Sequence, residues 1–73
     1  MRNKELEEKV YNYIKEHEKD NVDIVDIVCA IPNYGGERIL NTINDLRINK
    51  FIDRVDIVST YYKYVILRPY ENN

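Results

Sequence analysis

The segment GERILNTINDLRINK (residues 36–50) runs directly into FIDRVDIV (51–58), Ser59-Thr60 and YYKYVIL (61–67). In its first part, apolar side chains recur at Ile39, Ile43 and Leu46, a spacing that places them on one face of a helix. Its second part is rich in β-branched and aromatic residues, which is typical of strands. The segment therefore predicts a helix from Glu37 to Asn49, with Leu40 beside the core face, followed by a β-hairpin.

A longer helical pattern precedes this segment near the start of the chain. Apolar or semipolar side chains lie on one stripe at helical period, namely Leu6, Val10, Tyr13, Ile14 and His17. Asn3 is a suitable N-cap, and a polar turn follows the stripe. This pattern predicts a helix from about Lys4 to Glu18.

The run VDIVDIVCAI (residues 22–31) is ambiguous by periodicity alone. Its β-branched content favours a strand, whereas its spacing also fits a short helix. Asp23 is a good N-cap and Asp26 follows three residues later, which favours a helix from Ile24 to Ala30. That helix is expected to bury Val25, Val28 and Cys29, while Val22 forms an extended segment that joins the hairpin.

Two connections are expected from turn chemistry. Pro32 moves Ile31 out of the helical region, and Gly35 and Gly36 allow positive φ, so residues 31–36 form a turn. Ser59-Thr60 marks the hairpin bend but lacks the Asn-Gly pair of a tight primed turn. A loop of about four or five residues that includes Tyr61 is therefore expected.

Length and composition restrict the function. Seventy-three residues make one domain, with an expected core from about residue 4 to 68 and a flexible tail from 69 to 73. The single cysteine, Cys29, is expected to be a buried thiol in a reducing compartment. The charged start and the lack of a long apolar stretch predict a soluble, intracellular (cytoplasmic) protein without a membrane role. One histidine and one cysteine offer no catalytic triad and no metal site, so neither an enzyme nor a cofactor is expected.

The net charge is −2, and the C-terminal half of the chain is the less acidic half. On the helix from Glu37 to Asn49, the face opposite the apolar stripe carries side chains suited to base edges and phosphates. The hairpin adds hydroxyls and cations near its tip. The candidate DNA-binding residues are Arg38, Asn41, Thr42 and Asp45 on the helix and Arg54, Thr60, Tyr61 and Lys63 on the hairpin. The simpler alternative is a solvated polar helix face and tyrosines that fill a small sheet.

Three helices followed by a two-stranded hairpin is an α+β arrangement. From about Leu6 to Leu67 the chain resembles the winged helix-turn-helix superfamily of DNA-binding regulators, and it is most similar to minimal members from archaea and their viruses. The resemblance rests on residues 22–27, 36–46 and 50–52. It implies that the third helix enters the major groove of duplex DNA and that the hairpin, or wing, lies on the backbone. Lys50 stands where the family often has Gly, which implies a left-handed residue or a different helix end there.

The resemblance further implies a homodimeric transcriptional regulator that contacts two half-sites about one helical turn apart. One surface for a second copy is offered by Tyr11 and Val10, taken as semi-exposed, and the C-terminal Pro69-Tyr70 is expected to pack beside them. The acidic net charge and the tyrosine-rich hairpin leave a second hypothesis open. In that hypothesis the domain binds a protein partner and no DNA.

Overall fold

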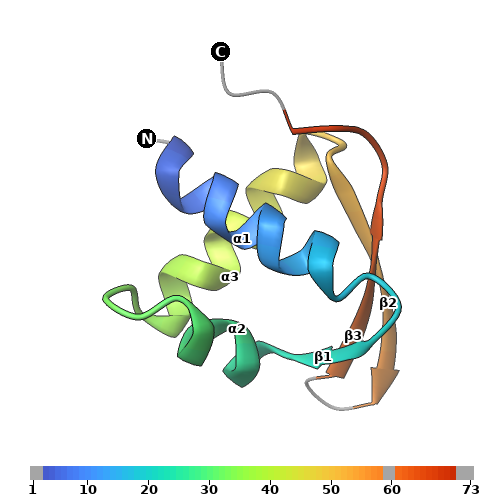
Figure 1. The fold of residues 1–73 in the computed structure, drawn as a ribbon, viewed down its shortest axis with the longest axis horizontal. Helices are drawn as coiled ribbons and strands as arrows, with labels where there is room; N and C mark the ends of the chain where they lie inside the picture. The colour runs from blue at the N-terminus through green and yellow to red at the C-terminus, as the bar shows by residue number, and fades with distance from the viewer. Residues whose placement is uncertain (1–2, 59–60, 71–73) are drawn as a thin grey trace.

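The computed structural model describes residues 3–58 and 61–70. The chain forms α1 (Lys4–Glu16), β1 (Asn21–Asp23), α2 (Ile24–Ala30), α3 (Gly36–Ile48), β2 (Ile52–Val58) and β3 (Tyr61–Ile66), as Figure 1 shows. The three helices gather on one side, and the strands form an antiparallel sheet in the order β1-β3-β2. The expected α+β arrangement of three helices with a hairpin and a third short strand is therefore present.

The helix α1 begins where the sequence indicates and ends two residues early. The Asn3 side chain accepts a hydrogen bond from the Leu6 N–H at 3.0 Å, which caps the first turn. At the other end, His17 leaves helical geometry, and its backbone N–H bonds to the carbonyls of Tyr13 and Ile14. The His17 ring also stacks on Tyr13, with ring centroids 4.2 Å apart. These local contacts end the helix before Glu18.

The ambiguous segment folds as the sequence favoured, with a strand at Asn21–Asp23 and a helix at Ile24–Ala30. The Asp23 side chain accepts from the Val25 N–H, and the Asp26 side chain accepts from the Asp23 N–H, which makes a capping box. Of the three residues expected to face inward, Val28 packs against the core, whereas Val25 and Cys29 do not. Ile27 is buried, whereas Val25 is 58% exposed.

Cys29 is exposed, so the expectation of a buried thiol is also wrong. The α2 stripe that meets the core runs through Ile24, Ile27, Val28 and Ile31, and Cys29 follows it on the solvent side. We expect a thiol-specific reagent such as Ellman's reagent to titrate Cys29 in the native protein, because the sulfur needs no unfolding to react. A thiol that reacts only after denaturant is added would contradict this orientation.

The turn between α2 and α3 uses a different residue from the expected one. Neither glycine adopts positive φ; Asn33 does, at 79°. Gly35 is the N-cap of α3 and supplies no side-chain cap. At the other end of α3, Lys50 has a φ of 65°. The left-handed residue that was expected at this position is therefore present.

The core lies between the helices and the inner face of the sheet. On β3, the side chains of Tyr62, Tyr64 and Ile66 face the helices, while those of Tyr61 and Lys63 face away. Phe51 and Ile52 close the core after α3, as expected. The buried apolar residues are Leu6, Val10, Tyr11, Ile14, Val22, Ile27, Ile31, Ile39, Ile43, Leu46, Phe51, Ile52 and Tyr64.

The segment after β3 closes over α1. Tyr70 packs on Tyr11 and Phe51, with ring centroids 5.5 and 5.0 Å apart. The Tyr11 hydroxyl donates to the Arg68 carbonyl at 3.0 Å. The expected packing of Tyr70 beside Tyr11 is present, but Val10 and Tyr11 are both buried, so the expectation that they are semi-exposed is wrong. The packed core extends to Tyr70, beyond the expected limit near residue 68.

The hairpin is tighter than expected. Tyr61 belongs to β3, where it pairs with Val58 and, on the other side, with Asp23. It is therefore not a loop residue, and Ser59-Thr60 lie outside the described residues. A β-bulge between Asp56 and Val58 shifts the register near the end of β2. The bulge gives the strand a local bend next to the hairpin end.

Candidate nucleic-acid interface

The helix α3 presents a polar face away from the core. Its inner side is fixed by Ile39 and Ile43, which are completely buried. Arg38 and Asn41 therefore lie on the solvent side and are exposed. Within residues 3–58 and 61–70, neither of these two side chains forms a hydrogen bond or an ion pair. Both polar groups are thus available to a ligand.

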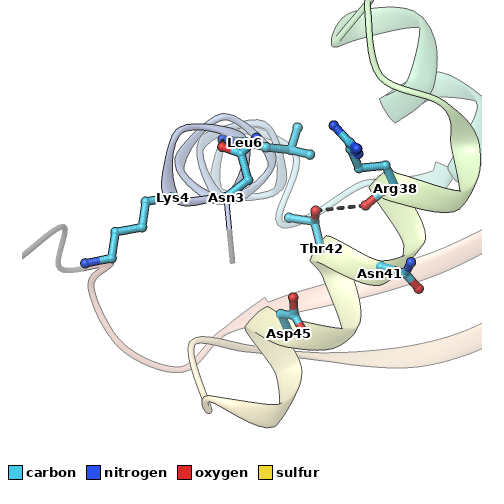
Figure 2. A pocket seen from close by; sticks show the side chains of 7 residues that line it. All are labelled: Asn3, Lys4, Leu6, Arg38, Asn41, Thr42 and Asp45. Carbon is cyan, nitrogen blue, oxygen red and sulfur yellow. Dashed lines mark hydrogen bonds between the residues drawn. The ribbon is translucent and has the colours of Figure 1, made fainter. Parts of the chain in front are cut away.

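These two residues border two adjoining hollows. The larger hollow, of about 630 Å³, lies between the start of α1 and α3. Figure 2 shows the Arg38 and Asn41 side chains rising from α3 on its border. The smaller hollow, of about 350 Å³, lies over the first turns of α3. Lining the larger hollow are Asn3, Lys4, Leu6, Arg38, Asn41, Thr42 and Asp45, and lining the smaller one are Gly35, Glu37, Arg38 and Asn41.

Thr42 does not occupy the outward position that was expected. Its side chain is only 6% exposed, and its hydroxyl donates to the Arg38 carbonyl at 2.8 Å (Figure 2). A threonine in a helix can satisfy its hydroxyl on the preceding turn in this way, which allows burial. Thr42 is therefore a packing residue at the floor of the larger hollow, and the expected outward position is wrong.

Asp45 is half-buried at the other end of the same hollow. Its carboxylate repels an approaching phosphate, and it suits a hydrogen-bond donor such as the exocyclic amine of cytosine. Two cationic residues line the same hollow, namely Arg38, two turns earlier on α3, and Lys4 on α1. The lining of the hollow therefore carries charges of both signs.

The hairpin residues are not gathered on one surface. Arg54 and Lys63 come from neighbouring strands but project on opposite faces of the sheet, because Arg54 pairs with Tyr64 and Lys63 pairs with Val55. Lys63 and Tyr61 share the outer face and are exposed. Thr60, the remaining candidate on the wing, lies outside the described residues.

Arg54 lies on the inner face, half-buried against aromatic rings. Its guanidinium carbon is 4.2 Å from the centroid of the Tyr62 ring, a cation–π arrangement. The neighbouring Tyr64 hydroxyl is buried and makes no hydrogen bond in the described parts of the chain. Burial raises the pKa of Tyr64 above its usual value, and the charges of Arg54 and Arg47 partly oppose that rise. Arg54 therefore packs against the aromatic rings of the sheet and also contributes a positive charge there.

Sequence reasoning missed Asn44, which is exposed on α3. It follows Asn41 by three residues, so the helical spacing that identified Arg38 and Asn41 would also have found it. Its side chain makes no hydrogen bond with the residues that the structure describes. Arg38, Asn41 and Asn44, hereafter the α3 triplet, form one row along the helix.

The described residues contain no group of His, Cys, Asp and Glu side chains that could hold a metal ion. Among the same residues, no helix has both the length and the apolar character that crossing a bilayer requires. Comparison of the chain with protein-family models, with curated proteins and with solved structures found no match. The chemistry of the α3 triplet therefore carries the functional argument.

Proposed function

We propose that this domain binds double-stranded DNA and acts as a sequence-specific transcriptional regulator, with α3 in the major groove. The observation that carries the proposal is the α3 triplet, three exposed polar side chains in a row without internal partners. An arginine matches the O6 and N7 acceptors of guanine, and asparagine matches the N6 and N7 positions of adenine. A helix is also the element whose width suits the major groove of B-DNA.

The hairpin supplies the second contact in this proposal. Tyr61 and Lys63 lie on its exposed outer face, where a lysine and a phenolic hydroxyl suit phosphate oxygens. Such contacts fix the position of the protein on the duplex without selecting a sequence. We further propose that the regulator is a homodimer, since two copies of a small domain contact two half-sites.

Replacing the α3 triplet residues tests the proposal. We expect Asn41→Ala to weaken binding to the preferred sequence by about 1–3 kcal/mol, because a bidentate base contact is lost. We expect Arg38→Ala to weaken binding to the preferred sequence by about 1–3 kcal/mol and to relax specificity at one base pair, because the bidentate contact with guanine is lost. Fluorescence anisotropy with a labelled duplex selected from a random pool measures both effects over a series of salt concentrations.

Lys15→Ala is the matched control, because it also removes one cation but lies on α1 outside the two hollows. Its affinity should stay close to that of the unchanged protein. Equal affinity in the Arg38, Asn41 and Lys15 variants, all folded by circular dichroism, would refute α3 as the DNA-binding surface. NMR titration of labelled protein then locates the residues that do respond to DNA.

A protein-binding domain is the second candidate function, and one observation favours it. Several large apolar side chains of the hairpin region are exposed, namely Val55, Ile57, Val58, Val65 and Leu67. Exposed apolar patches of this kind mark interaction surfaces. A stoichiometric protein partner captured by the folded domain, together with no retention on DNA resin, would favour this function.

A further inference from the structure

The strand β2 is an edge of the sheet, because β3 lies between β1 and β2. In β3, the Leu67 N–H points toward β2 and donates to the Phe51 carbonyl. The Ile66 N–H points the other way and donates to the Glu18 carboxylate. Backbone groups alternate in direction along a strand. In the β2–β3 pairing, Asp53 and Val55 therefore bond to β3.

It follows that Arg54 and Asp56 direct their backbone N–H and C=O groups to the free edge. The Arg54 N–H confirms this direction, since it bonds at 2.8 Å to the Asp53 side chain rather than to β3. Unpaired edge groups are a template for another strand. Val55 lies between these two residues, and its side chain is 55% exposed. The edge thus offers both backbone groups and apolar surface.

Arg54 and Asp56 also carry opposite charges on the same face of the strand. Within the described residues, neither side chain has an ion-pair partner, although the two residues are only two positions apart on β2. The Arg54 guanidinium lies over the Tyr62 ring and does not reach Asp56 within the same chain. A second strand laid antiparallel on this edge would bring each of them opposite its counterpart.

We propose that two copies of this chain pair through their β2 edges, antiparallel about a two-fold axis at Val55. This register places Arg54 of each copy opposite Asp56 of the other, and Val55 opposite Val55. The flanking pairs form about four backbone hydrogen bonds in all, because both residues of each pair face the edge. The two sheets become one continuous sheet across the axis.

Other registers fit less well. An axis between two residues would place an edge-facing residue opposite a β3-facing one, so the backbone groups would not match. An axis at Arg54 would place two arginines opposite each other, and an axis at Asp56 two aspartates, which is destabilising. The Val55 register alone combines matched backbone groups with opposite charges. The Asp53 side chain, which covers the Arg54 N–H in the single chain, rotates away on pairing.

A charge reversal tests this register. We expect Arg54→Asp and Asp56→Arg each to weaken dimerisation at least tenfold, since each places like charges opposite across the axis. The double variant with both changes restores opposite charges and the original net charge, and it should dimerise like the unchanged protein. Sedimentation equilibrium over a range of concentrations, without DNA, gives the dissociation constants, and circular dichroism verifies folding.

A further variant, Val55→Lys, changes only an exposed side chain and places two lysines at the axis, so it should also yield monomers. The proposal is overturned if the unchanged protein stays monomeric at millimolar concentration. It is also overturned if the single variants remain dimeric, or if the double variant folds but does not recover dimerisation. This inference rests on the proposed function, because it specifies the surface through which the proposed homodimer forms. The sedimentation assay contains no DNA, so it tests dimerisation alone. A monomeric result would overturn this inference, and DNA binding would still be tested separately by anisotropy.

Discussion

Replacing Ile43 by alanine is expected to lower the free energy of unfolding by about 2–5 kcal/mol. The Ile43 side chain is completely buried on the inner side of α3, where the helix meets the rest of the core. Its removal loses apolar burial and leaves a cavity that rigid neighbours fill only in part. A domain of this size has a stability of about 5 kcal/mol or somewhat more, so the variant loses a large part of it.

Urea unfolding followed by circular dichroism at 222 nm measures this change. Leu40→Ala is the matched control, because Leu40 stands on the same helix but is 40% exposed, contrary to its expected place beside the core. Its cost should be less than half that of Ile43→Ala. Similar costs for the two variants would mean that α3 is rotated about its axis, and the α3 triplet would then lose its outward orientation.

The second large effect concerns the segment that closes over α1. We expect Tyr70→Ala to lower the free energy of unfolding by about 2–5 kcal/mol, because it removes a ring that packs against the core. Each aromatic contact, with Tyr11 and with Phe51, contributes about 0.5–1.5 kcal/mol beyond burial. The Tyr70 hydroxyl also donates to the buried Glu7 carboxyl group at 3.1 Å, and losing such a bond costs about 1–3 kcal/mol.

Tyr70→Phe separates these contributions, because it keeps the ring and removes only the hydroxyl. It should show the hydrogen-bond part of the loss alone, and thermal unfolding of both variants gives the comparison. If Tyr70→Ala unfolds at the same temperature as the unchanged protein, the packing of residue 70 on α1 is refuted. The effect bears on the site, since Glu7 and the nearby Lys4 belong to the helix that forms one wall of the larger hollow.

Local signals were sufficient to predict most elements. The capping side chains of Asn3 and Asp23 act within three residues of their own position, so the starts of α1 and α2 follow from short stretches of sequence. The apolar spacing of α3 likewise identified Ile39, Ile43 and Leu46 as buried. These features depend on neighbours in the chain and not on the rest of the fold.

The orientation of α2 could not be predicted in the same way. Almost every residue from Ile24 to Ile31 is apolar, so no polar stripe marks the solvent side. Only the packing against α3 and the start of the sheet decides that Ile27 turns inward and Val25 outward. The exposure of Cys29 follows from that choice. The periodicity of apolar residues therefore cannot predict which side of α2 faces the core.

The candidate site shows the same division. Arg38 and Asn41 were correctly expected to be exposed, because they lie opposite the apolar stripe. Thr42 was misplaced, because its hydroxyl finds a partner one turn back and so tolerates burial. The contact of Tyr70 with Tyr11 was expected, but the near-complete burial of Tyr11 was not, because it depends on how closely distant parts of the chain pack. On the hairpin, pairing on β3 decides which face each residue occupies.

The strand β1 has consequences for biosynthesis. Its only strand partner among the described residues is β3, which the ribosome makes much later, after α2, α3 and β2. During translation, β1 therefore remains without its strand partner until residues 61–66 have left the exit tunnel, whereas α1 meets α3 earlier. The sheet is therefore completed only in a late step, and a chain that pauses before Tyr61 carries β1 with its backbone groups unpaired, a state in which nascent chains are prone to aggregate.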